Sequence, residues 1–513
     1  MNGGESLVRT LLASGVDTCF ANPGTSEMHF VAALDRVGGM RCVLGLAETV
    51  VTGCADGYAR MSERPAATLL HLGPGLANGM ANLHNARKSR TPVVNLVGDH
   101  ASYHLNSGSL GTSDIAGMAR TVSDWVRTSA AVSEVGTDAA AAVQAARNAP
   151  GQVATLILPA DMSWSEGGRV AEPLTVAGPQ AVSGDTIASV ARVLRRREPT
   201  VLLLWHQALS EEGLRAAQRV ASVSGAVLRT SATVPRMARG QGRPAVDRIP
   251  YNIDPALQML SGVRHVILVG ANMPAPFFAY PGKPHRLAPP DASIHVLARA
   301  EQDQVGALLA LADELGAPPG DVPLPAVPRP VAARGAFSPD GFADTLAALL
   351  PENCIVADDA VTSGRSLIAR THGAAPHDWL MACGGAIGHA LPCATGAAIA
   401  CPERRLVCLQ ADGAGMYTLQ SLWTQARENL DVVTVIFANR VYKILYGELA
   451  AVGAQPGPAS NALFDLGRPE LDWTLLARGM GVEAARVDTL EGFADVFRAA
   501  CARRGPFLIE FFI

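Results

Sequence analysis

The stretch QADGAGMYTLQSLWTQARENLDVVTVIFANRVYKIL, Gln410 to Leu445, decides the fold. The apolar run RLVCLQA leads into it and ends at Asp412, and a second apolar run, DVVTVIFA, ends at Asn439. Both runs are typical of buried strands, and the amphipathic segment Leu419–Leu430 predicts a helix between them. A right-handed strand–helix–strand crossover places the ends of two parallel strands at one edge of a sheet. We therefore expect Asp412 and Asn439 to lie side by side.

The rest of the chain repeats this alternation of strand-like and helical stretches. Short apolar runs such as VDTCF, RCVLGL, AATLLHL, PTVLLLW and RHVILVG predict strands. The helices expected between strands include Glu48–Ser62, Ala77–Lys88 and Glu211–Ser224. This order is typical of parallel sheets with crossover helices.

Two Pro-rich stretches without apolar periodicity divide the chain. Gly167–Gly184 and Gly316–Gly335 are both typical of linkers between domains. The sequence thus predicts an α/β fold with three open parallel-sheet domains, which cover residues 1–165, 185–315 and 336–513.

Composition indicates an enzyme with a small-molecule substrate. A net charge of −4 leaves no basic surface for nucleic acid or an anionic membrane. The nine cysteines form no CxxC pair and no zinc-binding spacing, which favours a reduced, cytoplasmic setting. The N-terminus lacks the apolar core of a signal peptide, and no apolar stretch reaches the roughly 18 residues of a membrane-spanning helix. We therefore expect a soluble protein.

The pair Asp412 and Asn439 has the chemistry of a magnesium site. A carboxylate, an amide oxygen and nearby backbone carbonyls are hard oxygen ligands that suit Mg²⁺ shared with phosphate oxygens. Gly413 and Gly415 allow the backbone to approach those phosphates closely. Taken singly, Asp412 could only cap a helix and Asn439 could only turn the chain. Their joint spacing favours the metal.

The same segment resembles the thiamine-diphosphate motif that opens with Gly-Asp-Gly and closes with Asn-Asn. It departs from that motif at Ala411 and Ala438, which replace the first glycine and the first asparagine. The resemblance implies thiamine diphosphate as the cofactor. It also implies Mg²⁺, bound by two side chains and one backbone carbonyl, those of Asp412, Asn439 and Val441. The residues that it places against the diphosphate are Asp412, Gly413, Ala414, Asn439 and Val441.

A second motif, GLAETVVTGCADGYARMSERP, covers Gly45–Pro65 and contains Glu48 in the first turn of a predicted helix. A lone glutamate there is most often present for the helix dipole. The stretch resembles the E-x-x-x-x-x-x-A-D-G-Y-A-R segment of the benzoylformate decarboxylase and acetolactate synthase family. In that family the glutamate bonds the aminopyrimidine nitrogen of the cofactor, which helps to deprotonate the thiazolium carbon. The resemblance therefore implies that Glu48 is catalytic and contacts the cofactor.

Two further residues have counterparts on the substrate side of that family. ANPGTSEMHF resembles the Asn-Pro-Gly turn beside the reacting centre, and Thr25 is its hydroxyl nearest in register to a substrate-contacting serine. His71 aligns with a histidine that reaches the substrate carboxylate or the intermediate. Asn78, in the Gly-rich stretch GPGLANG that we expect to form a loop, has no assigned counterpart but could support the cofactor or the substrate. From the residues alone, Thr25 could be a helix cap and His71 a structural strand-end residue.

MACGGAIGHALP, Met381 to Pro392, resembles the loop that supports the bent cofactor. The resemblance places Gly385 in that loop and Ile387 between the two cofactor rings. Without it, Ile387 would be predicted to belong to the core.

The central segment departs from the decarboxylases. Their second active-site histidine has no match, because GANMPAPFFAYPGKPH presents Phe277, Phe278 and Tyr280 instead, and VGDHASYH does not reproduce the His-His pair of pyruvate decarboxylases. This difference suggests an intermediate shielded from water, which favours transfer to a second carbonyl over protonation. The absence of GxGxxG does not support bound FAD, although FAD need not use that motif.

The resemblance spans the whole chain and implies pyrimidine-binding, central Rossmann-like and diphosphate-binding domains. It also implies a homodimer or homotetramer, in which Glu48 of one chain meets Asp412 and Asn439 of another. The leading hypothesis is an acetolactate-synthase-like enzyme that decarboxylates a 2-oxo acid and transfers the enamine to an acceptor carbonyl, a second 2-oxo acid or an aldehyde. The alternatives are a non-ligating 2-oxo acid decarboxylase that releases an aldehyde, and a catalytically silent cofactor-binding subunit.

Overall fold

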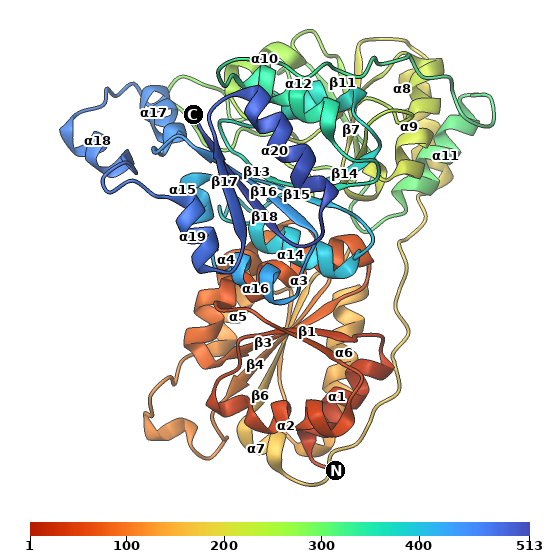
Figure 1. Cartoon of the computed structure of the whole chain (residues 1–513). Helices are drawn as coiled ribbons and strands as arrows, with labels where there is room; N and C mark the ends of the chain where they lie inside the picture. Colours follow the sequence, from red (N-terminus) through yellow and green to blue (C-terminus); the bar gives the residue numbers. More distant parts are fainter.

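Three open α/β sheets follow one another along the chain in the computed structural model, which describes residues 1–513. In Figure 1 the N-terminal sheet occupies the lower half of the molecule, and the other two sheets lie side by side above it. All strand pairings except one are parallel, so the predicted α/β fold of three open parallel sheets is confirmed. The predicted domain boundaries remain a prediction.

The first sheet has six strands in the order β2-β1-β3-β4-β6-β5. Its strands are β1 Thr18–Ala21, β2 Arg41–Leu44, β3 Ala66–His71, β4 Val93–Asp99, β5 Trp125–Thr128 and β6 Val153–Pro159. Its helices are α1 Gly3–Ala13, α2 Met28–Val37, α3 Glu48–Ser62, α4 Leu72–Lys88, α5 Ile115–Val122, α6 Val135–Arg147 and α7 Ala160–Trp164. The central strands β3, β4 and β6 are buried on both faces, as expected for a sheet covered by helices.

The second sheet has five strands in the order β10-β8-β7-β11-β12. Its strands are β7 Thr200–Leu204, β8 Val227–Thr230, β10 Asp247–Arg248, β11 His265–Val269 and β12 Ser293–Ala298. Its helices are α8 Gly184–Leu194, α9 Glu211–Ser224, α10 Ile253–Leu260 and α11 Gln304–Glu314. An extended segment links α7 to α8 along the outside of the molecule, where the first linker is expected (Figure 1).

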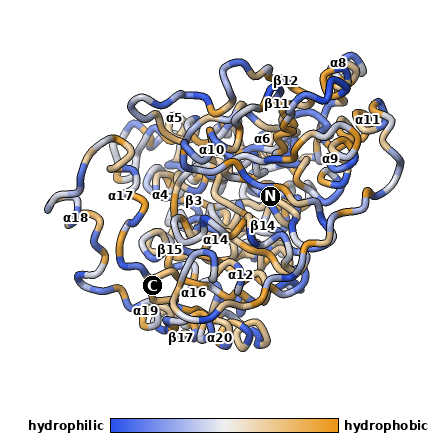
Figure 2. Tube along the Cα trace, turned by 90° about the horizontal axis from the view of Figure 1, so that it is seen from above, coloured by the Kyte–Doolittle hydropathy of each residue, from blue (hydrophilic) through white to orange (hydrophobic).

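The third sheet has seven strands in the order β17-β18-β16-β15-β13-β14-β9. Its strands are β9 Met237–Arg239, β13 Ile355–Asp359, β14 His377–Met381, β15 Leu406–Ala411, β16 Val432–Ala438, β17 Glu483–Val487 and β18 Phe507–Phe512. Its helices are α12 Pro339–Leu349, α13 Leu367–Arg370, α14 Ala390–Ala400, α15 Asp412–Gly415, α16 Ser421–Arg427, α17 Lys443–Ala451, α18 Pro458–Phe464, α19 Trp473–Gly479 and α20 Leu490–Ala502. Helices α17 and α18 have no buried residue and stand out from the body of the molecule (Figures 1 and 2).

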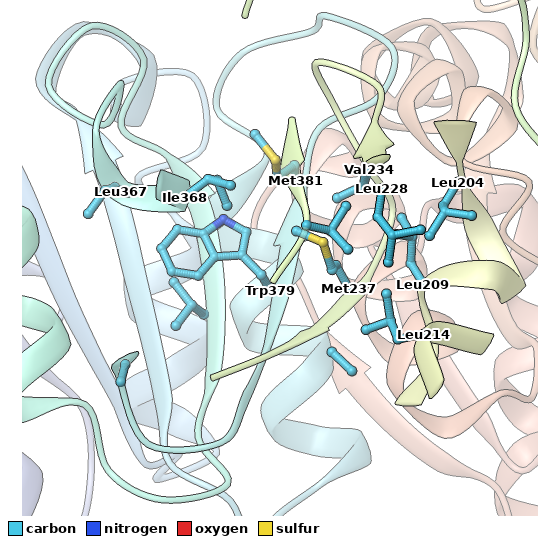
Figure 3. Packing of buried hydrophobic residues seen from close by; sticks show 14 of the residues in the cluster. Leu204, Leu209, Leu214, Leu228, Val234, Met237, Leu367, Ile368, Trp379 and Met381 are labelled. Atoms are coloured by element: carbon cyan, nitrogen blue, oxygen red, sulfur yellow. The ribbon is translucent and has the colours of Figure 1, made fainter. Parts of the chain in front are cut away.

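Strand β9 joins the central segment to the third sheet. It pairs antiparallel with β14, so that Met237 lies opposite Trp379. Figure 3 shows both side chains in one continuous hydrophobic cluster, with Leu204, Leu209 and other central-segment residues on one side of Met237. The second and third sheets therefore share a core.

A buried ion cluster ties the first sheet to the other two. Arg60 of α3 pairs with Asp56 at 2.6 Å, and His389 contacts the same carboxylate at 2.7 Å. Arg60 also donates to the carbonyls of Pro235 and Met381. Burial alone would raise the pKa of Asp56, but Arg60 and His389 outweigh it and hold that pKa well below its usual value.

Two of the four predicted helices have the predicted ends, since α3 covers Glu48–Ser62 and α9 covers Glu211–Ser224, whereas the helix predicted over Leu419–Leu430 is shorter, as α16 covers Ser421–Arg427. The prediction of a loop over GPGLANG was wrong, because α4 begins at Leu72, directly after β3. Glycine disfavours an isolated helix by about 1 kcal/mol per residue, but α4 buries Leu76 and Leu83 in the core, and this burial offsets the cost. No helix of the protein is long and apolar enough to cross a membrane.

Candidate functional site

Asp412 and Asn439 lie at neighbouring strand ends, as the crossover predicts. Asp412 directly follows β15 and Asn439 directly follows β16, which pairs with β15 in parallel. The Asp412 carboxylate accepts hydrogen bonds from the backbone amides of Arg440 at 2.6 Å and Gly413 at 2.8 Å. Asn439 Oδ1 accepts one from the Val441 amide at 3.0 Å. One backbone turn therefore holds both side chains.

The Asp412 carboxylate is buried without a positive charge beside it. The residue is 3% exposed, and its hydrogen-bond partners are backbone amides. Burial raises its pKa to about 6, although those amides oppose the shift. A buried carboxylate ordinarily needs a cation or a metal as its partner. The Asp412 carboxylate, the Asn439 amide oxygen and the Val441 carbonyl are hard oxygen donors of the kind that suits Mg²⁺.

The turn that follows β16 and contains Asn439 is strained. Arg440 adopts a left-handed conformation with φ of 57°. Such a conformation in a residue other than glycine costs of order 1–3 kcal/mol and is typical of functional sites. Two contacts compensate, since the Arg440 guanidinium lies 4.2 Å from the centre of the Phe512 ring and the Arg440 carbonyl accepts from the Leu466 amide.

The loop 381–392 is fixed by Asp359, the last residue of β13. Its Oδ2 accepts hydrogen bonds from the Gly388 amide at 2.7 Å and from the Gln410 side chain at 3.1 Å. Burial raises the pKa of Asp359 to about 6, and these donors oppose the shift. The loop is therefore tied to the strand ends that carry Asp412.

Ile387 projects from this loop, with 37% of its surface exposed. It is therefore not a core residue, and it can contact a molecule that lies over the loop. The Phe277 ring lies against the loop at Gly385, where an added Cβ would stand 2.9 Å from Phe277 Cζ. On the other side, Asn85 of α4 donates to the Ala386 carbonyl at 2.9 Å.

Glu48 is the first residue of α3 and faces α4. Its Oε2 accepts a hydrogen bond from Asn78 Nδ2 at 3.1 Å. Asn78 lies in the second turn of α4, so the structure brings these two predicted cofactor residues together. No salt bridge neutralises Glu48, which leaves its carboxyl group free to bond a ligand.

His71, the last residue of β3, is held by a carboxylate that the sequence interpretation did not single out. Its Nδ1 lies 3.0 Å from Glu27 Oε2 and 3.0 Å from Ser26 Oγ. Glu27 is 3% exposed and also accepts from the Gly24 amide at 2.8 Å. Gly24 is required here, because an added Cβ would stand 2.2 Å from His71 Cγ.

Thr25 has an exposed side chain and makes no hydrogen bond, whereas its neighbour Ser26 contacts His71. The Gly24-x-x-Glu27 spacing of a capping box could have indicated Glu27 in advance, since its side chain caps the 3-10 turn Thr25–Glu27.

Glu48 and the loop that adjoins the Asp412 site contact α4 at different points. Asn78 contacts Glu48, and Asn85 contacts the loop 381–392. These two asparagines are seven residues apart on α4, a rise of about 10 Å. No hydrogen bond joins Glu48 to Asp412 or Asn439.

Two family descriptions match the chain. Residues 1–118 match "Thiamine pyrophosphate enzyme, N-terminal TPP binding domain", and residues 363–511 match the corresponding C-terminal TPP binding domain. These matches include Glu48 and His71 in the first range and Asp412 and Asn439 in the second.

Related sequences and structures cover nearly the whole chain. A Mycobacterium tuberculosis (strain ATCC 25618 / H37Rv) protein, provisionally named acetolactate synthase large subunit IlvX, is 50% identical over 99% of this chain and 98% of its own length. Benzoylformate decarboxylase of Pseudomonas aeruginosa is 28% identical over 97% of this chain and 96% of its own length. The structure of a thiamine diphosphate-dependent 4-hydroxybenzoylformate decarboxylase from Rhodococcus jostii RHA1 superposes with a TM-score of 0.87 at 22% identity, over 100% of this chain and 99% of the other.

Proposed function

Since this chain belongs to the thiamine-diphosphate-dependent enzymes, we propose that it is an acetolactate-synthase-like carboligase. It decarboxylates a 2-oxo acid and joins the remaining acyl group to an acceptor carbonyl. With an aldehyde as acceptor, one 2-oxo acid anion, one aldehyde and one proton become CO₂ and a 2-hydroxy ketone. The 50% identity to a relative named as an acetolactate synthase subunit favours this reaction.

We propose that Mg²⁺ links the cofactor diphosphate to Asp412, Asn439 and the Val441 carbonyl. The buried, cation-free carboxylate of Asp412 supports this assignment. The remaining proposed cofactor contacts are Glu48, Asn78, Gly385, Ile387, Gly413 and Ala414.

Bound thiamine diphosphate supplies a carbon nucleophile and an electron sink, which a 2-oxo acid needs in order to lose CO₂. Glu48, oriented by Asn78, holds a proton opposite the pyrimidine ring. His71, held by Glu27 and Ser26, binds the substrate carboxylate, and Thr25 presents a free hydroxyl beside it. Phe277 and Ile387 present exposed apolar surface over the loop 381–392, which would exclude water once a ligand covers it.

One observation favours ligation over protonation. The central segment contributes an apolar and weakly acidic lining to the site. Phe277 and Phe278 pack edge to face, and Tyr251 lies against Phe277. Burial and Glu448 raise the pKa of Tyr280 to about 12, and burial likewise raises that of Tyr251. Neither tyrosine is an effective proton donor at neutral pH, so this lining would not favour protonation of a carbon nucleophile over its addition to an acceptor carbonyl.

A plain decarboxylase is the second candidate, and the His71–Glu27 pair favours it. A histidine held by a buried carboxylate can deliver a proton to carbon, which would release an aldehyde.

Product analysis separates the two reactions. The Mg²⁺- and thiamine-diphosphate-loaded protein is incubated with pyruvate or benzoylformate, with and without an acceptor aldehyde. We expect 2-hydroxy ketones whenever an acceptor is present, at the expense of free aldehyde. If aldehyde remains the only product at every acceptor concentration, the carboligase proposal is wrong and the decarboxylase holds.

We further propose that the active site forms between chains of a homodimer or homotetramer. The resemblance to the thiamine-diphosphate enzymes supports this arrangement, and no hydrogen bond joins Glu48 to Asp412 or Asn439 within one chain.

A further inference from the structure

A carboxylate lies between two tyrosine hydroxyls at the edge of the candidate site. Tyr280 Oη donates to Glu448 Oε2 at 2.6 Å, and Tyr251 Oη donates to Glu448 Oε1 at 3.3 Å. Glu448 belongs to α17, whereas both tyrosines belong to the central segment. Tyr280 also packs against the small hydrophobic cluster beneath β11, which fixes its ring.

Glu448 and its two tyrosines border the space above the loop 381–392. The Tyr251 ring lies 5.6 Å from the Phe277 ring, centre to centre, and Phe277 lies against Gly385. On the other side, α17 begins two residues after Val441, whose carbonyl we assign to the metal. Glu448 is thus connected to both halves of the proposed cofactor site.

The Glu448 carboxylate retains an unused negative charge. It forms no ion pair, although it is partly exposed. A carboxylate has roughly four acceptor positions, and the two tyrosines occupy two of them. The remaining positions can accept hydrogen bonds from a ligand.

We propose that Glu448, positioned by Tyr251 and Tyr280, binds a cationic group at the far end of the substrate, which is therefore a 2-oxo acid whose side chain ends in a guanidinium or ammonium group. This inference rests on the proposed 2-oxo acid chemistry. His71 and Thr25 act on the reacting end of the same substrate, and Glu448 acts on its tail. Charge-assisted hydrogen bonds are about twice as strong as neutral ones, so Glu448 determines specificity.

Two arginines near Glu448 and its tyrosines would favour a substrate with a negatively charged tail instead. Arg365 is exposed and lies close enough to Tyr251 to lower its pKa, while burial and Glu448 raise it. The Arg248 guanidinium donates to the sulfur of Met381 at 4.0 Å and lies near Asp358. A substrate with a second carboxylate could use these arginines, so the test includes an anionic tail.

The experiment compares three substrates with the loaded, full-length enzyme: 5-guanidino-2-oxopentanoate, neutral 2-oxohexanoate and anionic 2-oxohexanedioate. We expect the guanidino substrate to have a kcat/KM about 10- to 100-fold above that of 2-oxohexanoate, the range of a hydrogen bond to a charged group. Glu448→Gln should abolish this preference through KM and leave 2-oxohexanoate within about threefold. Tyr280→Phe, which removes the shorter hydrogen bond to Glu448, should reduce the preference in part.

Glu212→Gln is the matched control, because Glu212 is exposed on α9 and forms no ion pair. Calorimetry with 5-guanidinopentanoate and hexanoate measures the same preference without turnover. Equal use of the guanidino and neutral substrates, a preference for 2-oxohexanedioate, or an unchanged preference in Glu448→Gln would each overturn the inference while leaving the proposed function intact. Selective binding of 5-guanidinopentanoate without turnover of any 2-oxo acid would instead overturn the proposed function alone.

Discussion

At the residue scale, three carboxyl groups occupy different environments that suit different tasks. Asp412 is buried without a cation, Glu27 is buried against His71, and Glu48 meets Asn78 at the start of a helix. Both Asp412 and Glu48 were predicted from the sequence. Asp412 was predicted from its position after a strand, and Glu48 from a family motif. Glu27 was not, since its spacing from Gly24, with two residues between them, gives a weak signal until the fold brings His71 beside Glu27.

Glu48→Gln separates binding from chemistry. The amide preserves the size and the contact to Asn78 but cannot share a proton with the cofactor. We expect thiamine diphosphate to bind with little loss and kcat to fall about 10²- to 10⁴-fold, the range of general acid–base catalysis. Steady-state kinetics and a cofactor titration on the same preparation check both. A variant with the wild-type rate would refute the catalytic role of Glu48.

Asp412 predicts how metal affinity depends on pH. Its carboxyl pKa of about 6 is raised, so the group is neutral below pH 6 and ionised above it. Because Mg²⁺ needs the ionised form, apparent Mg²⁺ affinity should fall up to about tenfold per pH unit below pH 6 and level off above it. Mg²⁺ titrations between pH 5 and 8 measure the slope. Asp412→Asn cannot titrate, so its apparent Mg²⁺ affinity should change with pH only through the ionisation of the cofactor. An identical pH slope in the wild-type protein and in Asp412→Asn would contradict the assignment.

At the element scale, the sequence predicted strands and helices best where local signals agree with packing. Helix α9 begins after a capping Ser210 and ends at Ser224, directly before Gly225, and both signals are visible in the sequence. Helix α4 contradicts its local signal, because Leu72 takes a left-handed conformation with φ of 53° and turns β3 directly into the helix. The burial of α4 in the core makes that turn favourable. A short stretch of sequence does not show which contacts will bury a helix.

The loop 381–392 supplies a prediction at this scale. Gly388 has φ of 82°, and an added Cβ would stand 2.9 Å from the Ala414 carbonyl oxygen, which belongs to backbone. Gly388→Ala must therefore shift either the loop 381–392 or the backbone at Ala414, at a cost of order 1–3 kcal/mol. We expect about a tenfold loss of thiamine diphosphate affinity, measured by calorimetry. Gly479→Ala in α19 is the control, because nothing lies within 4 Å of its added Cβ; equal affinities in both variants would contradict a cofactor role for the loop.

At the scale of the whole molecule, three sheets were predictable from the alternation of strands and helices, but their joints were not. Strand β9 leaves the central segment to pair with β14, and Arg60 reaches carbonyls from both other parts of the chain. Such contacts depend on residues more than a hundred positions apart, which no local periodicity records.

The proposed site between chains predicts complementation between variants of Glu48 and Asp412. Glu48→Gln and Asp412→Ala chains should each be inactive alone, because every site then lacks one group. Random mixing of the two should restore about a quarter of wild-type activity, since half of the dimers are mixed and each contains one intact site. Activity of co-expressed, separately tagged chains measures this. Mixtures that stay inactive while wild-type and variant chains demonstrably associate would place both groups in one chain.

The most direct measurement is a calorimetric titration of the cofactor-free protein with thiamine diphosphate, with and without Mg²⁺. We predict saturable binding that requires Mg²⁺ and is severely weakened by Asp412→Ala, because the buried carboxylate has no other cation to pair with. Absence of saturable binding, or binding that is unchanged by removal of Mg²⁺ and by Asp412→Ala, would contradict the assignment of this site and the enzymatic function built on it.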